Sequence, residues 1–250
     1  MMKRFGLIGF PLTHSFSKKY YDSKIAEEQI PDVQYELFPI PAIEAFPRLV
    51  ADDSLLMGVN VTIPYKIAVM DYLDHLSPEA RAIDAVNCIR IERPHRGNTV
   101  LTGYNTDVFG FMESLKPLLR SSHRKALVLG NGGAAKAVTY ALTLLGIPYT
   151  TVSRKPAEGQ YSYNQLDSII MASHTLIINT TPLGTYPAVE GCPDIPYQHI
   201  GSEHLLYDLV YNPAETTFLK RGAARGASVK NGLEMLELQA ERNWEIWNGH

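Results

Sequence analysis

The chain has 250 residues and a formal net charge of -3, with 45% hydrophobic and 20% charged residues. This composition excludes a mainly disordered chain, a fibrous protein and a basic nucleic-acid-binding protein. The longest uncharged run, 168–189, contains prolines and polar residues, which excludes a membrane span there. Two cysteines without a CxxC pattern, and no signal peptide, predict a cytoplasmic location.

Apolar and alternating runs before residue 105 predict five strands, at 4–10, 33–38, 56–63, 86–91 and 99–101. A helix is expected from Ser17 to Gln29, with Ser17 as its N-cap. Pro64 closes the third strand and suits the first turn of another helix. The segment 94–98 predicts a hairpin turn between the last two of these strands.

From residue 105 onward, strands and helices alternate with short connections, which predicts a parallel sheet with helices on both faces. Strands are expected at 125–129, 149–152, 175–178, 205–210 and 227–230. Helices are expected at 107–119, from the glycine turn after 129 to 145, and at 165–172, 215–224 and 233–247. The change of pattern near residue 105 predicts a boundary between two α/β domains.

Three small residues, Gly130, Gly132 and Ala135, follow an apolar strand in the spacing of a dinucleotide-binding loop. Gly130 permits a tight turn, and Gly132 lets the backbone approach a pyrophosphate. Ala135 lets the helix pack closely on the strand, and the helix N-terminus offers N–H groups to phosphates. The alternative is an ordinary tight turn between strand and helix.

Arg154 stands 22 residues after Gly132, where an NAD-binding fold usually carries Asp or Glu. Arg154 and its neighbour Lys155 are both cations, and arginine can bind a phosphate through two parallel hydrogen bonds. This pair favours the 2′-phosphate of NADP over NAD. The alternative is a basic surface loop.

Two polar clusters follow strands in the first domain. Ser15 and Ser17 lie near a helix start, where they could hold a carboxylate or only cap the helix. Asn60 and Thr62 alternate with apolar residues, so both should project to one side of a strand end. Lys66 is expected one step into the next helix, where an exposed lysine is the plain alternative.

A third cluster comprises 84–87 and 103–107. Asp107 is expected at the start of a helix, where a carboxylate interacts favourably with the helix dipole. Simple N-capping is the alternative role.

Together these segments resemble the shikimate dehydrogenase family over essentially the whole chain. Eight segments agree in order and spacing: His14-Ser15-x-Ser17, Asn60-Val61-Thr62-x-Pro64-x-Lys66, Ala85-Val86-Asn87, Gly103-x-Asn105-Thr106-Asp107, Gly130-x-Gly132-Gly133-Ala134, Asn179-x-Thr181-Pro182-x-Gly184, Tyr207-Asp208-Leu209-x-Tyr211 and Gly232-x-x-Met235-Leu236-x-x-Gln239-Ala240. Lys18 and Thr185 depart from the family pattern, which commonly has Pro and Met there.

The resemblance implies an α/β substrate-binding domain over 1–104, with the helix at 233–250 returning to it. It also implies a Rossmann-like NADP-binding domain over 105–232. The implied reaction is the reversible reduction of 3-dehydroshikimate to shikimate by NADPH, a step of aromatic amino acid and chorismate biosynthesis. The expected partners are small molecules and no metal, nucleic acid or membrane, and both a monomer and a homodimer are compatible with the sequence.

The resemblance also implies residue roles. Lys66 would be the general acid/base, with Asp107 as its partner. Substrate contacts would come from Ser15, Ser17, Thr62, Lys66, Asn87, Asp107, Tyr211 and Gln239. The cofactor would be held by Gly130, Asn131, Gly132, Gly133, Ala134, Ser153, Arg154, Lys155, Leu209 and Gly232.

Three other functions remain open from the sequence. A quinate/shikimate dehydrogenase that uses NAD is disfavoured by Arg154 and Lys155. A non-catalytic nucleotide-binding protein on the same fold is disfavoured by the simultaneous presence of Lys66, Asp107 and the two serines, Ser15 and Ser17. A one-carbon folate dehydrogenase has a similar architecture, but the two serines favour a smaller hydroxy acid.

Overall fold

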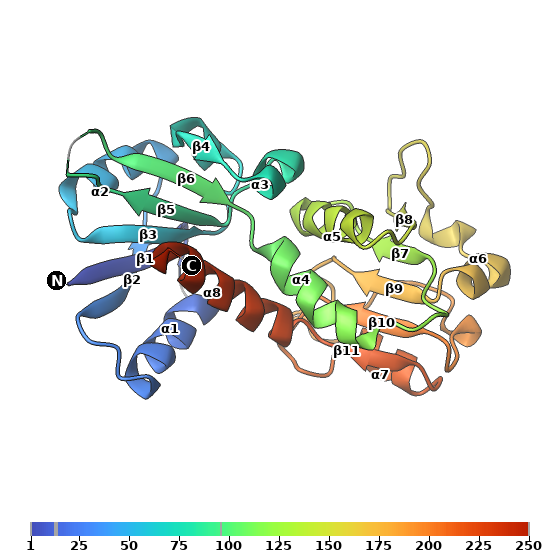
Figure 1. The fold of residues 1–250 in the computed structure, drawn as a ribbon. Coiled ribbons are helices and arrows are strands. Elements are labelled where there is room, and N and C mark those ends of the chain that lie inside the picture. Colours follow the sequence, from blue (N-terminus) through green and yellow to red (C-terminus); the bar gives the residue numbers. More distant parts are fainter. Residues whose placement is uncertain (1, 13–14, 96, 250) are drawn as a thin grey trace. The chain divides into compact units, whose positions relative to one another are not determined.

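The computed structural model of the chain describes residues 2–12, 15–95 and 97–249. His14, part of one family motif, and Arg96, in the expected turn, lie outside the described residues. The chain forms two compact units, Met1–Thr106 with Gln239–His250 and Asp107–Leu238 (Figure 1). Within the described residues, no helix combines the length and the apolar character needed to cross a membrane.

Six strands form the sheet of the first unit in the order β2-β1-β3-β5-β6-β4. They are β1 (Lys3–Gly9), β2 (Val33–Pro39), β3 (Leu56–Val61), β4 (His75–Leu76), β5 (Cys88–Glu92) and β6 (Val100–Tyr104). β1 is parallel to β2 and β3, whereas β5 is antiparallel to β3 and β6, so the sheet is mixed. The ends of β1 and β3 lie at the same edge, where the first two polar clusters begin.

The helices of this unit are α1 (Phe16–Glu27), α2 (Phe46–Asp52) and α3 (Pro78–Ile83). The predicted N-cap of α1 was wrong by two residues. Ser15 has an extended backbone, and its Oγ accepts the Lys18 N–H at 3.2 Å, so Ser15 is the cap. Ser17 instead lies within the first turn of the helix.

The helix expected directly after Pro64 does not form. Thr62 accepts the Tyr65 N–H at 2.9 Å in a tight turn, and the next regular element is the 3-10 helix η2 (Ala68–Tyr72). Tyr65 is buried and its hydroxyl donates to the Ile40 carbonyl at 2.7 Å, whereas Ile63 is 75% exposed, so a tertiary contact of Tyr65 holds the segment in this turn. Lys66 therefore lies in a turn and not in a helix.

The C-terminal helix α8 (Leu233–Asn248) packs its second half on the first sheet, which confirms its expected return. Trp247 stacks on Phe5 with ring centroids 4.8 Å apart, and its Nε1 donates to the Ile89 carbonyl at 3.0 Å. Gly58 makes room for it, because a Cβ there would lie 2.3 Å from Trp247 Cδ1. Residues 233–238, the beginning of α8, belong to the second unit.

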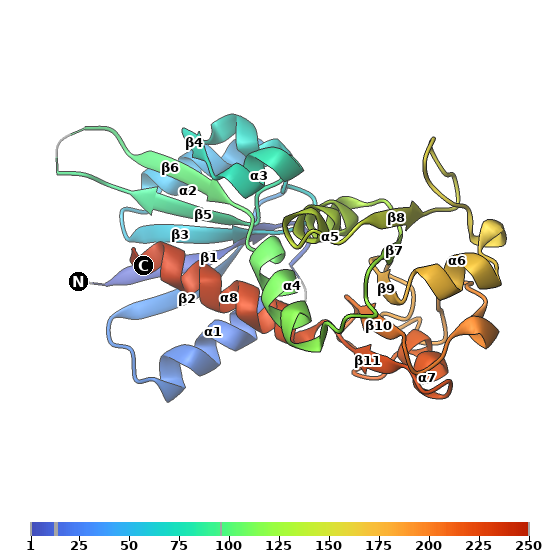
Figure 2. The ribbon, with the colours of Figure 1, turned by 45° about the vertical axis from the view of Figure 1, so that its right-hand side comes forward.

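The second unit contains a fully parallel five-stranded sheet in the order β11-β10-β9-β7-β8 (Figure 2). Its strands are β7 (Ala126–Leu129), β8 (Tyr149–Val152), β9 (Leu176–Asn179), β10 (Leu205–Asp208) and β11 (Ser228–Lys230). All residues of β7, β9 and β10 are buried, as expected for central strands of a parallel sheet.

The helices that accompany this sheet are α4 (Asp107–Leu115), α5 (Gly133–Leu144), α6 (Ser168–Ser173) and α7 (Thr217–Ala223). α4 is shorter than predicted because Pro117 cannot continue the helical hydrogen bonds, and a 3-10 turn (Lys116–Leu118) follows. α6 begins later than predicted because the Asp167 carboxylate caps it by accepting the Ile170 N–H at 2.8 Å.

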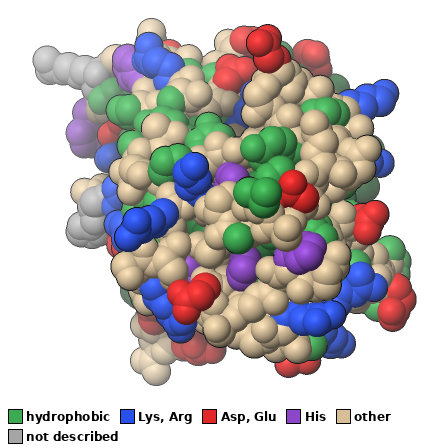
Figure 3. Space-filling view, turned by 90° about the vertical axis from the view of Figure 1, so that its right-hand side faces the viewer, with side chains coloured by type: hydrophobic (Ala, Val, Ile, Leu, Met, Phe, Trp, Pro, Cys, Tyr) green, Lys and Arg blue, Asp and Glu red, His purple; other side chains and the backbone are tan. Residues whose placement is uncertain are grey.

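Three buried histidines precede neighbouring strands: His123 before β7, His174 before β9 and His204 before β10. His123 Nδ1 accepts the Arg120 N–H at 3.0 Å, and His204 makes the same kind of bond with Gly201 at 3.1 Å. Both rings must be unprotonated at Nδ1 to accept these bonds. Figure 3 views the molecule from a side on which several histidine side chains reach the surface.

Candidate active site

Ser17 is tied into the first unit by a chain of buried polar groups. Burial raises the pKa of Tyr35 well above its usual range, and a hydrogen bond with Ser17 acts in the opposite direction. The Tyr35 hydroxyl donates to Asn60 Oδ1 at 2.8 Å, and Asn60 Nδ2 donates to the Asn87 carbonyl at 3.4 Å. The predicted carboxylate-binding serine is therefore connected to the predicted hydroxyl-binding Asn87.

Lys66 is held beside the same strand end. Its carbonyl accepts the Val86 N–H at 2.7 Å, and Asn87 accepts the Val61 N–H at 2.9 Å. These backbone bonds fix the turn that carries Lys66 against the segment that carries Asn87. The Lys66 side chain is half-buried. Thr62 precedes this turn and is also half-buried.

A second polar network joins Asn87 to the C-terminal helix. Asn87 Oδ1 accepts the Thr106 N–H at 2.8 Å, and the Thr106 hydroxyl donates to Asn243 Oδ1 at 2.6 Å. Asn243 Nδ2 in turn donates to Gln239 Oε1 at 3.1 Å. The structure thus connects two predicted substrate-binding residues, Asn87 and Gln239, through Thr106 and Asn243, to which no role was assigned.

The glycine loop of the second unit lies at the carboxyl end of β7, where the strand order turns from β8 to β9. Gly130 has a φ of +106°, and a Cβ there would lie 2.8 Å from Thr180 Oγ1. A Cβ added at Gly132 or at Gly133 would meet no atom within 4 Å, so open space lies over this backbone. Asn131 and Ala134 are exposed beside them. The N-terminus of α5 has no side-chain cap, which leaves N–H groups for an anion.

The segment after β8 carries Ser153, Arg154 and Lys155. Ser153 is buried, and its hydroxyl has no hydrogen-bond partner among the described residues. Arg154 and Lys155 are exposed. A buried hydroxyl without a partner is rare, and a bound ligand atom is one way to satisfy it. These groups fit the adenosine phosphate of a dinucleotide.

Asp208 joins the loops at the carboxyl ends of β9 and β10 through hydrogen bonds. It is fully buried and accepts bonds from Asn179 at 2.9 Å, from the Val210 N–H at 3.0 Å and from Thr216 at 2.6 Å. Burial raises the pKa of Asp208 to about 6, against the effect of these three donors. Asn179 and Asp208 belong to family segments, but no role was predicted for either residue. Nothing in the sequence indicated a role for Thr216.

Leu209 and Gly232 are brought together by this arrangement. The Leu209 N–H donates to the Asn179 carbonyl at 3.0 Å, and Gly232 donates to the Val210 carbonyl at 3.3 Å. Tyr211 follows on the same loop and is exposed. Asp107 is the first residue of α4 and is half-buried.

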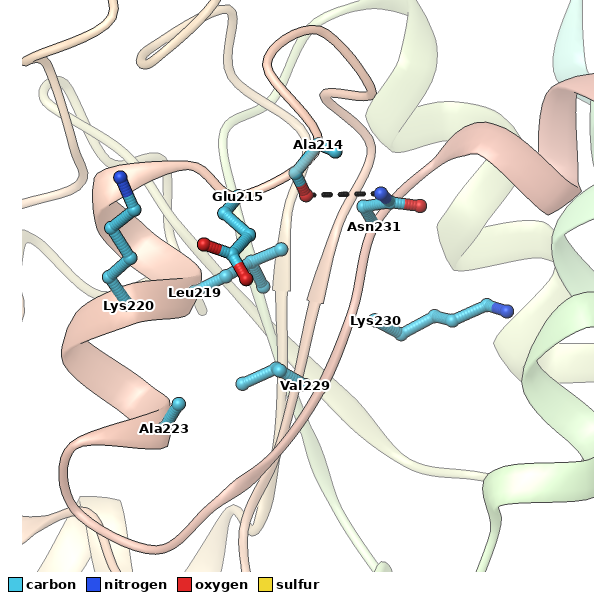
Figure 4. Close-up of a pocket in the computed structure, with 8 residues that line it drawn as sticks. All are labelled: Ala214, Glu215, Leu219, Lys220, Ala223, Val229, Lys230 and Asn231. Atoms are coloured by element: carbon cyan, nitrogen blue, oxygen red, sulfur yellow. Dashed lines mark hydrogen bonds between the residues drawn. The ribbon is translucent and has the colours of Figure 1, made fainter.

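A groove of about 510 Å³ lies between α7 and β11 (Figure 4). Its lining contains Ala214, Glu215, Leu219, Lys220, Ala223, Val229, Lys230 and Asn231, and none of the predicted site residues. Asn231 donates to the Ala214 carbonyl at 3.0 Å and accepts the Leu233 N–H at 3.2 Å. These bonds hold the chain on both sides of Gly232, so the groove borders the predicted cofactor site without being part of it.

A mixed α/β unit with a buried polar site, followed by a parallel unit with a glycine loop at its switch point, defines a two-unit α/β protein with a Rossmann-like half. Residues 7–89 match the family model described as "Shikimate dehydrogenase substrate binding domain". Shikimate dehydrogenase (NADP(+)) of Clostridium beijerinckii is 40% identical over 98% of this chain and 92% of its own length. The chain belongs to the shikimate dehydrogenase family.

Solved structures share the fold of this chain over its whole length. Shikimate 5-dehydrogenase of Thermus thermophilus, in complex with NADP(H) and shikimate, is 32% identical with a TM-score of 0.84 and covers 100% of this chain and 94% of its own. The Listeria monocytogenes enzyme, in complex with shikimate and NAD, is 26% identical with a TM-score of 0.86, at coverages of 100% and 92%. The ligand-free 5-ketofructose reductase of Gluconobacter sp. strain CHM43 is 27% identical with a TM-score of 0.86, at coverages of 100% and 94%.

Proposed function

We propose that this protein catalyses the reversible, NADP-dependent interconversion of 3-dehydroshikimate and shikimate. The observation that carries the proposal is the full-length similarity to Shikimate dehydrogenase (NADP(+)) of Clostridium beijerinckii. The described geometry supports it, because Ser17, Lys66, Asn87 and Gln239 lie on one set of connected segments in the first unit. The predicted cytoplasmic location stays a prediction.

We assign substrate binding to the first unit and cofactor binding to the second. The support is the family match at 7–89 for the first and the glycine loop at a switch point for the second. The sequence placed the boundaries at 104/105 and 232/233, and the compact units meet at 106/107 and 238/239.

The substrate would be held by its carboxylate and its ring hydroxyls. Ser15 and Ser17, at the N-terminus of α1, would bind the carboxylate, since hydroxyl donors and a helix N-terminus both favour an anion. Thr62, Asn87 and Asp107 would bind ring hydroxyls. Gln239 and Tyr211 would complete the substrate contacts.

Lys66 would supply the proton. In the reducing direction the ketone oxygen gains negative charge as hydride reaches its carbon, and the Lys66 ammonium would stabilise that charge and donate the proton. Asp107 would orient Lys66 and bind a neighbouring hydroxyl. In the oxidising direction Lys66 takes the same proton back.

The cofactor, when bound, supplies or accepts the hydride. The backbone of 130–134 and the N-terminus of α5 would hold its pyrophosphate. Ser153, Arg154 and Lys155 would hold the adenosine phosphate, and Leu209 and Gly232 would line the nicotinamide site. The unpartnered Ser153 hydroxyl and the open space over Gly132 and Gly133 support this fit.

The direct test is absorbance at 340 nm with shikimate as substrate and NADP or NAD offered in parallel. Rapid reduction of NADP, with little reduction of NAD, is the expected result. Quinate with each cofactor, and 5-ketofructose with NADPH, serve as comparison substrates. Faster turnover of either comparison substrate than of shikimate, or no turnover of any, would contradict the proposal.

A further inference from the structure

Asn243 is a buried polar residue of α8 to which no family segment assigns a role. Its side chain is 0% exposed and lies one helical turn after Gln239, on the same face of the helix. The Thr106 hydroxyl donates to its Oδ1 at 2.6 Å, and its Nδ2 donates to Gln239 Oε1 at 3.1 Å. Asn243 is also hydrogen-bonded to Tyr21. Burial raises the pKa of Tyr21 well above its usual range, and the bond with Asn243 acts in the opposite direction.

These bonds fix which end of the Asn243 amide points in which direction. A threonine hydroxyl has a single hydrogen, and that of Thr106 has two oxygens within reach, Asn243 Oδ1 at 2.6 Å and Asn87 Oδ1 at 3.2 Å, of which Asn243 is the nearer. The Tyr21 hydroxyl gives its own hydrogen to the Ala240 carbonyl at 2.9 Å, so in its bond with Asn243 it accepts from the Asn243 amino group. The amino group of Asn243 must then face the acceptors, of which Gln239 Oε1 is one. The orientation of the Gln239 amide is therefore set from inside the protein, with its oxygen toward Asn243.

We propose that Asn243 is a positioning residue that holds Gln239 as a hydrogen-bond donor toward the substrate. This inference rests on the proposed function, in which Gln239 contacts the substrate. With its oxygen bound by Asn243, Gln239 presents its amino group, and this group recognises an oxygen acceptor of the substrate. The backbone N–H of Thr106 gives Asn87 the same orientation by binding its Oδ1 at 2.8 Å.

The effect of losing Asn243 is specific to the substrate side. Without the Asn243 amino group, the Gln239 amide loses one of the bonds that orient it, so an ordering cost is added to each binding event. A lost hydrogen bond of this kind corresponds to a change of roughly tenfold in affinity. The network residues Asn87, Thr106, Gln239 and Asn243 all belong to the first unit, so the KM for NADP should stay unchanged.

The first variant is Asn243→Leu, which keeps the branching of the side chain at Cγ but removes both bonds. The expected result is a KM for shikimate raised about tenfold, with a KM for NADP within about twofold of the wild-type value. The same change made in a Gln239→Ala background should have no further effect on kcat/KM, because the residue it positions is absent. Additive losses in the double variant, or equal changes in both KM values, would overturn the proposal.

The second variant is Asn243→Asp, which keeps the acceptor for Thr106 and loses only the donor to Gln239. A protonated carboxyl can donate again, so its KM for shikimate should return toward the wild-type value as the pH is lowered. Asn243→Leu has no such group, and its KM relative to wild type should not depend on pH. Identical pH profiles for the two variants would contradict a positioning role.

Trp247→Phe is the matched control on the same helix. It removes the buried bond from Nε1 to the Ile89 carbonyl and none of the hydrogen bonds that join Thr106, Asn243 and Gln239. Its thermal unfolding temperature should fall while its KM for shikimate stays unchanged. Wild-type turnover is measured beside the variants, so a failure of the proposed function is seen as no shikimate oxidation by the wild type itself.

Discussion

Gly232 packs against the peptide of Leu209 so closely that a Cβ at position 232 would lie 2.2 Å from the Leu209 carbonyl oxygen. Both residues carry predicted contacts to the nicotinamide. Their backbones are held together by the bond from the Gly232 N–H to the Val210 carbonyl. The loop after β10 and the start of α8 are therefore fitted to each other without intervening side chains.

Gly232→Ala should disturb both the fold and cofactor binding, because either backbone must shift to make room. We expect a loss of about 1–3 kcal/mol in the free energy of unfolding and a raised KM for NADP. Urea unfolding and steady-state kinetics measure the two effects. Gly201→Ala is the control, since a Cβ there meets no atom within 4 Å. Equal behaviour of the two variants would contradict this account.

Lys66→Ala should lower kcat by roughly 10²–10⁴-fold, the usual range for a positioned acid/base group, with a smaller effect on KM. The rate of NADP reduction at saturating shikimate measures this change. Lys116→Ala removes an exposed lysine that pairs with Glu113 and should leave the rate unchanged. Turnover of the Lys66 variant within a few-fold of wild type would remove Lys66 from the chemistry.

Arg154→Ala should weaken NADP binding far more than NAD binding, because only NADP carries the 2′-phosphate. The ratio of kcat/KM for the two cofactors measures the change directly. Arg154 is exposed, so stability should hardly respond. Arg48→Ala removes another exposed arginine and serves as control. Equal losses with both cofactors would exclude the 2′-phosphate role.

Ser153→Ala should separate stability from cofactor binding. The Ser153 hydroxyl is buried without a partner among the described residues, so removing it should leave the free energy of unfolding unchanged or slightly raised. The KM for NADP should rise if the cofactor supplies the missing partner. Chemical unfolding without cofactor, followed by NADP titration, tests both parts. Lower stability together with unchanged NADP binding would reverse this interpretation.

The contribution of His123 to stability should fall as the pH drops below about 6.5, the ordinary pKa of histidine. Burial lowers the pKa of His123, with the charge of Arg120 acting in the same direction. The unfolded chain then binds more protons than the folded one between the folded pKa and about 6.5, so acid favours unfolding there. Above that range the contribution of His123 to stability is fully present.

His123→Asn isolates this contribution, because an asparagine oxygen can still accept the Arg120 N–H but does not titrate. Urea unfolding between pH 8 and pH 5.5 should show a smaller loss of stability for the variant than for the wild type. The comparison uses the difference between the two proteins, since Asp208, with its pKa raised to about 6, contributes a slope of the opposite sign. Parallel curves would show that His123 does not contribute.

The parallel unit was predicted well because its strands are short apolar runs between clear turns. β8 was placed at its observed ends, and β7 and β9 were displaced by one residue. The cap of α1 was misplaced because Ser15 and Ser17 are equally good caps, and only the backbone angles decide between them. The helix after Pro64 was wrong because burial of Tyr65, a tertiary effect, fixes that turn.

The family and the glycine loop could be predicted because each of the segments that indicate them consists of residues close together in the sequence. The roles of the individual site residues stay predictions. Asn243 could not be found this way, since its partner Thr106 lies 137 positions away and nothing near either residue indicates the pairing. Asp208 was visible in a motif, but its three donors are revealed only by the fold.

The return of α8 has a consequence for synthesis on the ribosome. The second unit is one continuous segment, Asp107–Leu238, so it can fold as soon as that segment has emerged. Most of the first unit precedes this segment in the chain, but the unit also needs Gln239 onward, including Trp247 in the space beside Gly58. The half that is translated first is therefore the half that is completed last, and until then its sheet exposes the apolar surface around Phe5 that Trp247 later covers.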